Sequence, residues 1–488
     1  MKSYVKKSLT VFSLFLLGIV VFAEKTPIQN VYQYRLENGL ELYVAENHAV
    51  PLVTIEIAVK TGGIAQTPEN AGLFHLYEHM MFKGNTKYRS AADVQNAIKK
   101  LGVTTWNGYT SDECVRYFFT IPVNQLYNGL EFWSYAVRTP LMDKAELENE
   151  KKVVLSEIKG GYSNPDTILS AGLMKALFPA APWKLDPAGP AENVQKATVA
   201  DLKSIQQTYY IPNNAALFVG GDVNPAEVYR LVKELYGSWK RAADPWTVPN
   251  KQQLTQPYLQ PQYFVMPYDK MSVQTARVLL MYRGPDAEFD RADTYGADVT
   301  GYLMDDPSGV FKQMLCSVPE LMIPGSDYVS EGYLTKKEGG IIQLSAVMLQ
   351  PEKNLADRAK LLLNTLNRKV FPDFSDGTAV SPAKLQNVYQ KLQDYRIMEM
   401  ETASGLLDTL LNWWVTADAG YYYTYNENMQ KTGTVEVASF VNKYFTGRNP
   451  VVVVLVNPDV YNADKQDFID SGYTEITKEN AFWWRDAK

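Results

Sequence analysis

The first third of the chain alternates strand-like and helix-like patterns of hydrophobic residues. Residues 40–45 alternate Leu, Leu and Val with Glu, Tyr and Ala, and residues 53–59 repeat this period of two. Both segments therefore predict strands with one buried face. A helical period then runs through residues 69–82 and is closed by Gly84.

The next elements continue this α+β pattern. Ser90 can cap a helix that stops at Gly102, and residues 115–121 predict a strand that Pro122 ends. Two long helical stretches follow, at residues 124–138 and 144–158. The first part of the chain is therefore expected to form one mixed domain.

A break in composition separates this part from the rest. Four prolines interrupt polar residues between positions 241 and 262, which predicts a linker. The strand at residues 54–60 resembles residues 275–282, and the segment 210–225 resembles 444–458. We interpret the chain as two copies of one α+β unit, residues 24–240 and 263–488, of which only the first carries the chemistry described below.

The N-terminus has the composition of a signal peptide. Lys2, Lys6 and Lys7 precede an uncharged stretch that is shorter than the roughly 20 residues of a membrane span, and Ala23-Glu24 offers a cleavage point. We therefore predict cleavage of residues 1–23 and export, to the periplasm rather than to the medium or to a membrane anchor. No later stretch is apolar and long enough to span a bilayer, so no other membrane contact is expected.

Composition and charge limit the kinds of molecule that the protein is expected to bind. The chain has 488 residues, 46% hydrophobic and 21% charged, as expected for a globular protein of more than one domain. Its net charge of −6 becomes more negative when the three N-terminal lysines are removed, which argues against binding nucleic acid. Cys114 and Cys316 lie far apart in the sequence, and two buried free thiols are favoured over a disulfide.

Two of the three histidines stand four residues apart in His75-Leu76-Tyr77-Glu78-His79. On a helix this spacing places both imidazoles on one face, where they can hold a zinc ion. A catalytic zinc has three protein ligands, and a neighbouring carboxylate can take the proton of the attacking water. We therefore predict His75 and His79 as metal ligands and Glu78 as the general base.

The third ligand is sought among the acidic residues of the helix at 144–158, which carries Glu146, Glu148, Glu150 and Glu157. Glu150 and Glu157 are seven residues apart and share a face. Glu157 is favoured because Val153-Val154-Leu155 directly precede it and indicate a buried position. Glu150 is then expected to orient a histidine or Glu157.

The segment Gly72–Gly84 and the glutamates seven apart resemble the pitrilysin/insulinase family of zinc metallopeptidases, in particular its processing-peptidase branch. The resemblance implies that the inverted motif of residues 75–79 binds one zinc ion per chain, with Glu157 as the third ligand. It implies that an extended peptide pairs with an edge strand at Asn107-Gly108. It also implies an α+β fold of two similar split βαβ-type domains joined by a linker, with helices covering one face of each sheet.

One departure from the family concerns the second half. Self-sufficient members carry an Arg and a Tyr there that bind the substrate backbone and the oxyanion, whereas residues 316–328 of this chain contain no Arg. Tyr328 can take the place of the Tyr. We therefore hypothesise that this chain is the zinc subunit of a heterodimer whose partner supplies the Arg/Tyr pair, with a homodimer as the other possibility.

The leading hypothesis is an exported zinc-dependent endopeptidase that cleaves peptides or unfolded protein segments. The alternative is a non-catalytic peptide-binding or assembly subunit of the same family, although such subunits tend to lose the metal ligands. An exported solute-binding protein of two lobes ranks last, because it does not explain the paired His and Glu residues.

Overall fold

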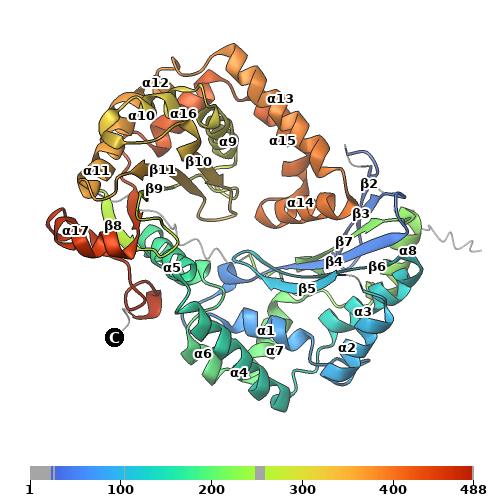
Figure 1. Ribbon diagram of the computed structural model, residues 1–488. Coiled ribbons are helices and arrows are strands. Elements are labelled where there is room, and N and C mark those ends of the chain that lie inside the picture. Colours follow the sequence, from blue (N-terminus) through green and yellow to red (C-terminus); the bar gives the residue numbers. More distant parts are fainter. Residues whose placement is uncertain (1–23, 26–27, 104, 248–258, 486–488) are drawn as a thin grey trace, which may run out of the picture.

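Two mixed β-sheets, one in each half of the chain, form the centre of the protein (Figure 1). The computed structural model describes residues 24–25, 28–103, 105–247 and 259–485. The first sheet has seven strands in the order β1 (Glu24–Lys25), β2 (Val31–Arg35), β3 (Glu41–Glu46), β7 (Ala215–Gly221), β4 (Leu52–Lys60), β6 (Cys114–Pro122) and β5 (Thr105–Thr110). The second has six, in the order β10 (Val329–Leu334), β11 (Ile341–Leu349), β9 (Thr275–Arg283), β12 (Val451–Val456), β8 (Gln262–Pro267) and β13 (Thr474–Glu475).

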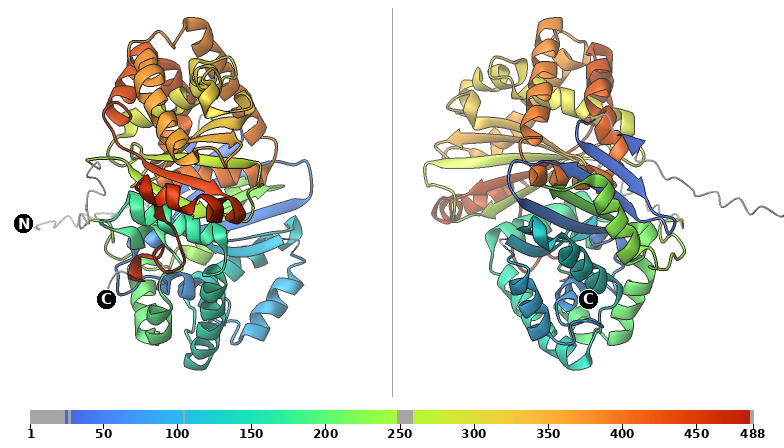
Figure 2. Two further views of the ribbon diagram at one scale, coloured as in Figure 1. Left: turned by 60° about the vertical axis from the view of Figure 1, so that its left-hand side comes forward. Right: turned by 90° about the vertical axis from the view of Figure 1, so that its right-hand side faces the viewer.

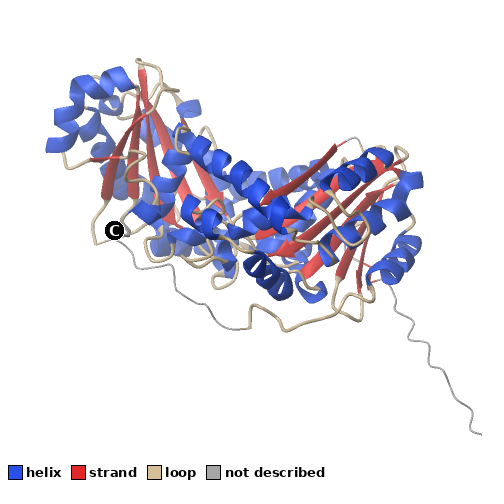
Figure 3. Ribbon diagram, turned by 90° about the horizontal axis from the view of Figure 1, so that it is seen from below, coloured by secondary structure: helices blue, strands red, loops and turns tan. Residues whose placement is uncertain are grey.

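The two sheets repeat one topology. In the first, β3 runs parallel to β7, which pairs antiparallel with β4; in the second, β8 runs parallel to β12, which pairs antiparallel with β9. Two further antiparallel strands follow β4 in the first sheet and β9 in the second, so that β5 and β10 are equivalent edge strands. The opposite edges differ, with β2 and β1 in the first sheet and β13 in the second. The predicted α+β fold of two similar units is confirmed, and Figure 3 shows the two sheets in separate lobes.

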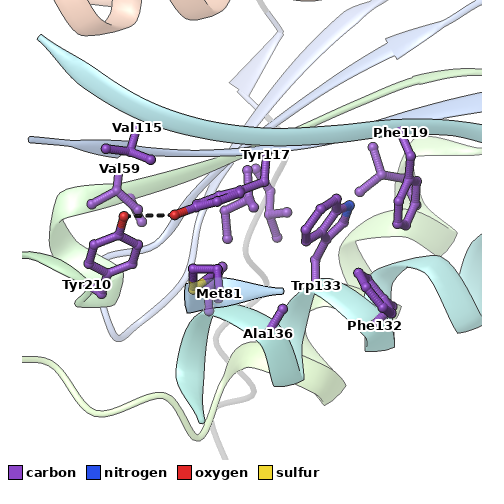
Figure 4. Packing of buried hydrophobic residues seen from close by; sticks show 14 of the residues in the cluster. Val59, Met81, Val115, Tyr117, Phe119, Phe132, Trp133, Ala136 and Tyr210 are labelled. Atoms are coloured by element: carbon purple, nitrogen blue, oxygen red, sulfur yellow. Dashed lines mark hydrogen bonds between the residues drawn. The ribbon is translucent and has the colours of Figure 1, made fainter. Parts of the chain in front are cut away.

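Helices of the first half cover one side of the first sheet (Figure 1). They are α1 (Leu73–Met81), α2 (Ala91–Lys100), α3 (Leu126–Arg138), α4 (Lys144–Gly161), α6 (Ala191–Lys196), α7 (Val199–Tyr209) and α8 (Pro225–Tyr236). Figure 4 shows the aromatic centre of this core, where Trp133 stacks on Phe119 with ring centroids 4.8 Å apart. The buried hydroxyl groups of Tyr117 and Tyr210 satisfy each other at 3.0 Å.

The second sheet is covered in the same way by helices of the second half. They are α9 (Arg291–Asp305), α10 (Val310–Cys316), α11 (Leu355–Thr365), α12 (Phe371–Ser375), α13 (Pro382–Glu399), α15 (Ala419–Lys431), α16 (Thr434–Tyr444) and α17 (Pro458–Asp470).

One helix from each half also packs on the sheet of the other half. Helix α14 (Ala403–Thr416) of the second half packs on the remaining face of the first sheet, and α5 (Pro165–Leu177) of the first half packs on the second sheet. The expectation that β3 has a single buried face is therefore wrong, because Tyr43 is only 1% exposed beneath α14. The expectation that helices cover one face of each sheet fails for the same reason.

The C-terminal segment returns to the first half (Figure 2). The ring of Phe482 lies 5.1 Å from that of Tyr162, and the indole N–H of Trp483 donates a hydrogen bond of 3.0 Å to Asp186. The two halves are thus joined by packing as well as by the chain.

Several predicted boundaries move by a few residues. Helix α1 begins at Leu73 rather than at residue 69, because Gly72 has a φ of 91° and ends a turn there. Helix α4 continues past residue 158 to Gly161. Cys114 and Cys316 are both free, as predicted, but only Cys114 is buried and Cys316 is half-buried. Within the described ranges, no helix combines the length and the apolar character that crossing a membrane requires.

The proposed signal peptide and residues 248–258 of the proposed linker lie outside the described residues. The domain boundaries drawn from the sequence stay predictions.

Candidate metal centre

Two packed helices, α1 and α4, bring the predicted ligands together. Gly72, just before α1, donates its backbone N–H to the side-chain oxygen of Gln66 at 2.7 Å, which fixes the start of the helix. At the start of α4, the carboxylate of Asp143 accepts hydrogen bonds from the N–H groups of Ala145 and Glu146. The sequence spacing on each helix then decides which side chains face the other helix.

His75, His79 and Glu157 converge on one point. One ligand atom from each lies within 4.8 Å of the others, and no other such group of His, Cys, Asp or Glu occurs among the residues described. The Nε2 atoms of the two histidines are 3.3 Å apart, and Glu157 Oε2 lies 3.5 Å from His79 Nε2 and 3.8 Å from His75 Nε2.

This arrangement fits a tetrahedral zinc ion. Zinc binds imidazole nitrogen at about 2.0–2.1 Å, so two tetrahedral nitrogen ligands stand about 3.3 Å apart. Burial, with a smaller effect of His79, lowers the pKa of His75 to about 4, which keeps its imidazole in the neutral form that binds metals. Two imidazoles and one carboxylate are also a typical donor set for catalytic zinc.

Glu150 lies behind His79 as predicted. Its Oε2 is 3.2 Å from His79 Nδ1, and its other oxygen is 2.7 Å from the Nζ atom of Lys83. Such a contact fixes the ring orientation of a ligand histidine. The contact of Lys83 with Glu150 was not predicted, because Lys83 lies just beyond the end of α1 at Met81 and meets a helix that is distant in sequence.

The prediction that Glu157 is buried is wrong. Val153 is 43% exposed and the Glu157 side chain 48% exposed, whereas Glu150 is only 6% exposed. Helix α4 presents Leu147, Glu150, Val154 and Ile158 inward, so the preceding run of apolar residues did not indicate which glutamate is buried. Glu157 reaches the histidines because it lies two turns beyond Glu150 on nearly the same side of the helix.

Glu78 lies beside the edge strand β5. Its Oε2 accepts a hydrogen bond of 2.7 Å from the hydroxyl of Thr110, and burial raises the pKa of its carboxyl. Gly108 permits this approach, because a Cβ atom there would lie 2.8 Å from Glu78 Oε1. The sequence did not predict the contact with Thr110, which follows from the period of two that it shares with Gly108.

Among the described residues, strand β5 pairs with β6 on one side and has no strand on the other. Asn107 and Gly108 therefore stand on an edge strand, as the resemblance implied. Asn107 is exposed and its side-chain oxygen accepts a hydrogen bond from the N–H of Gly108 at 3.0 Å. Trp106, 38% exposed, stands 5.3 Å from the ring of Phe82 and borders the site with an aromatic surface.

Tyr328 lies in the other half of the molecule, next to the equivalent edge strand β10. Its side chain is 47% exposed, and no hydrogen bond or ion pair links it to His75, His79 or Glu157 among the described residues. The structure therefore does not bring Tyr328 into contact with the candidate ligands.

Comparisons with known proteins show which family the chain resembles. A model of insulinase (peptidase family M16) matches residues 42–191, and a model of the peptidase M16 inactive domain matches residues 196–376. The mitochondrial-processing peptidase subunit beta of Blastocladiella emersonii is 27% identical over 203 residues, 42% of this chain and 43% of the relative. Zinc protease PqqE of Helicobacter pylori is 28% identical over 207 residues, 42% of this chain and 46% of the relative. The matches thus span about half the length of these curated relatives.

Solved structures share the fold across most of the chain. A protease from Helicobacter pylori has a TM-score of 0.67 at 20% identity and covers 87% of this chain and 98% of its own. The first half of the periplasmic protease PqqL from Escherichia coli has a TM-score of 0.72 at 18% identity and covers 91% and 95%. The two family models together match about two thirds of the sequence, and the chain belongs to the insulinase family, peptidase family M16.

Proposed function

We propose that this chain is a zinc-dependent endopeptidase that acts on peptides or unfolded protein segments. The observation that carries the proposal is the convergence of His75, His79 and Glu157 within 4.8 Å, with Glu78 beside them against an open edge strand. The relatives named as zinc proteases support the same chemistry.

The proposed ligands are His75, His79 and Glu157, with Glu150 orienting His79. Zinc, when bound, supplies a Lewis acid that polarises a carbonyl group and lowers the pKa of water. An extended substrate adds to β5 beside Asn107 and Gly108, so that its backbone is fixed before the chemistry begins. Glu78 then takes a proton from the attacking water and returns it to the leaving amine, a role suited to a carboxylate whose pKa is raised by burial.

Cleavage of a library of unstructured peptides by the purified chain, beside a Glu78→Gln variant, tests the proposal. The variant keeps the size of the side chain and is expected to bind zinc normally while losing at least about a hundredfold in kcat, because general-base catalysis contributes 10²–10⁴. Glu69→Gln, an exposed glutamate close in sequence, is the matched control. Equal cleavage by the Glu78→Gln variant and the native chain would rule out this mechanism.

We also propose that a partner subunit completes the site. The support is the lack of an Arg in residues 316–328, together with the exposed position of Tyr328. Loss of one oxyanion donor costs about 10²–10³ in kcat, so the chain alone is expected to be slow. Purification from its natural source tests this: a second, Arg-carrying family member is expected with it, whereas a fully active monomer or homodimer contradicts the idea.

Export to the periplasm is the last part of the proposal, and it rests on the composition of residues 1–23. The mass of the protein isolated from cells decides it. Cleavage is expected to leave Glu24 as the first residue, and a chain that retains residues 1–23 contradicts the prediction of a cleaved signal.

A further inference from the structure

The loop between β10 and β11, residues 335–340, reaches from the second half to the first. Three consecutive residues of this loop hold two different parts of the first half. We propose that it is a positioning clamp, which holds the substrate-binding strand β5 and the ligand helix α1 in place. The inference deepens the proposed peptidase function and rests on it for its kinetic consequence, but the contacts themselves do not depend on zinc.

Lys336 and Lys337 hold the turn between β5 and β6. The Nζ atom of Lys336 forms an ion pair with the carboxylate of Asp112, and the backbone N–H of Lys337 donates to Glu113 Oε1 at 2.5 Å. The other oxygen of Glu113 accepts a hydrogen bond of 3.0 Å from the hydroxyl of Thr416 on α14. Both acidic residues at the end of the edge strand thus find their partners in the second half.

Glu338 acts on a second element of the first half. Its carboxylate lies 3.1 Å from the Nζ atom of Lys184, a lysine only 4% exposed in the short helix η3 (Pro182–Leu185). Gln66 donates to the carbonyl oxygen of Trp183 in η3 at 2.6 Å and accepts from the N–H of Gly72 at 2.7 Å. A chain of contacts therefore runs from Glu338 to the first turn of α1.

The loop is itself fixed to the second half. The backbone N–H groups of Ala287 and Glu288 donate to the carbonyl oxygens of Lys336 and Lys337 at 2.9 and 3.1 Å. The N–H of Gly340 donates to Asp286 at 2.9 Å, and a Cβ atom on Gly340 would lie 2.0 Å from the carbonyl oxygen of Pro285. Because these contacts fix the loop to the second half, the loop can hold the first half in position.

Polar contacts that are buried or half-buried are costly to break from one side. Lys184 and Glu113 lie at the junction of the two halves, where removal of one partner leaves the other without its charge or hydrogen bond. The described residues of the second half include no group that could hold a metal ion, and under this proposal the contribution of the second half is the geometry of the edge strand. Loosening the turn at Asp112 is expected to weaken substrate binding, because a peptide pairs with the backbone of β5.

The test compares Lys336→Met with Lys336→Arg in the full chain. Amide hydrogen exchange is measured over residues 105–117, which cover β5, the turn and the start of β6. We expect exchange to become at least about tenfold faster in Lys336→Met, with a return toward the native rate in Lys336→Arg, since local opening governs exchange. The matched control is Lys431→Met, which removes an exposed lysine paired with Glu427 on α15.

The kinetic arm measures cleavage of one peptide. KM is expected to rise about tenfold in Lys336→Met with kcat changed less than threefold, because lost strand pairing removes uniform binding. Asp112→Asn, which is nearly isosteric, is expected to give the same result and to show no further loss in the double variant. It also replaces Lys336→Met if that variant fails to fold.

Native exchange rates in both Lys336→Met and Asp112→Asn would overturn the clamp. A native chain that cleaves nothing even together with its partner subunit would instead overturn the peptidase proposal, and the exchange arm would still decide whether the loop holds β5. Faster exchange without any change in KM would overturn the link between the clamp and substrate binding.

Discussion

In each half of the molecule a helix packs against the edge strand of the sheet, α1 against β5 in the first half and α9 against β10 in the second. We call each of these contacts a corner. The two corners differ in whether the helix or the strand carries the acidic side chain. In the first half, Glu78 on α1 lies over Gly108 on β5, where a Cβ atom would be 2.8 Å from the carboxylate. In the second, Glu331 on β10 lies over Gly301 on α9, where a Cβ atom would be 2.5 Å from the carboxylate. In each corner an acidic side chain lies over a glycine, but the acid is on the helix in the first half and on the strand in the second.

The sequences of the two edge strands, β5 and β10, are more similar than the directions in which their side chains point. Asn107-Gly108-Tyr109 and Glu331-Gly332-Tyr333 occupy the same positions in their strands. Gly108 faces the helix, however, whereas a Cβ atom on Gly332 would meet no atom within 4 Å. Because side chains alternate along a strand, a shift of one residue exchanges the two faces.

The chemistry of the two corners differs accordingly. The first corner has two imidazoles, and the second has none, since all three histidines precede residue 80. Burial raises the pKa of Glu331 to about 8 and that of Asp298 to about 7, and Asp298 accepts a hydrogen bond of 2.7 Å from Tyr425. The second corner therefore favours protonated acids. The same helix-on-strand arrangement thus occurs in both halves, and the side chains in it determine its chemistry.

The largest difference between the corners is expected in zinc binding. His79→Ala removes one of three proposed ligands and is expected to abolish stoichiometric zinc binding and to lower cleavage by at least about 10³, the order expected when an essential metal is lost. Asp298→Asn in the second corner is expected to leave zinc content unchanged. Zinc analysis of both variants after dialysis makes the measurement, and loss of zinc from Asp298→Asn would break the comparison.

Replacement of the glycine on each edge strand by alanine tests the comparison of the two corners further. Gly108→Ala is expected to lower kcat about ten- to a hundredfold, since the Cβ atom displaces Glu78 and small misplacements at a reacting centre are costly. Gly332→Ala enters open space on the equivalent strand and is expected to change kcat less than twofold. Steady-state kinetics decide, and similar losses in both variants would contradict the opposite facing of the two glycines.

The lysines of the two corners allow a third comparison. Lys83 lies 2.7 Å from Glu150, and Lys312 lies 2.8 Å from Asp305 on α9. Lys83→Met is expected to weaken zinc binding about tenfold, because Glu150 loses one of the partners that hold it against His79. Lys312→Met is expected to leave zinc affinity unchanged. Competition with a chelator measures both affinities, and equal affinities in Lys83→Met and the native chain would remove Lys83 from the site.

The smallest effect is expected in the pH dependence of stability. Folding raises the pKa of Glu331 from 4.5 to about 8, so the folded state holds a proton that the unfolded state releases. The free energy of unfolding is therefore expected to fall as pH rises from about 4.5 to about 8. Glu331→Gln stays neutral and is expected to be more stable than the native chain at pH 8, with a difference that grows as pH rises and is small near pH 4.5.

Urea unfolding of the native chain and the variant at the two pH values measures this effect. Glu320→Gln, an exposed glutamate of the same half, serves as the control. A variant that is equally destabilised at both values would mean that Glu331 is ionised in the folded protein.

Most elements near the site could be predicted because each depends on a local pattern. The period of two predicted β3, β4 and β6, and the cap at Ser90 predicted α2. Asp93 completes a capping box at this end of α2 that was not predicted. The repeat of β4 in β9 and of β7 in β12 follows from similar patterns of buried residues. Helix ends were less certain, since the start of α1 depends on the turn at Gly72 and its contact with Gln66.

The sequence by itself determined the pair of histidines one helical turn apart, the glutamate between them and the second pair of acids on α4. These follow from spacing along single helices, a property that the chain carries wherever it folds. Only the tertiary structure decided that Glu150 is buried and Glu157 exposed, that α14 covers β3, and that residues 335–340 contact Asp112 and Glu113. Each of these depends on a segment distant in sequence, and a local pattern holds no information about which distant segment will cover it.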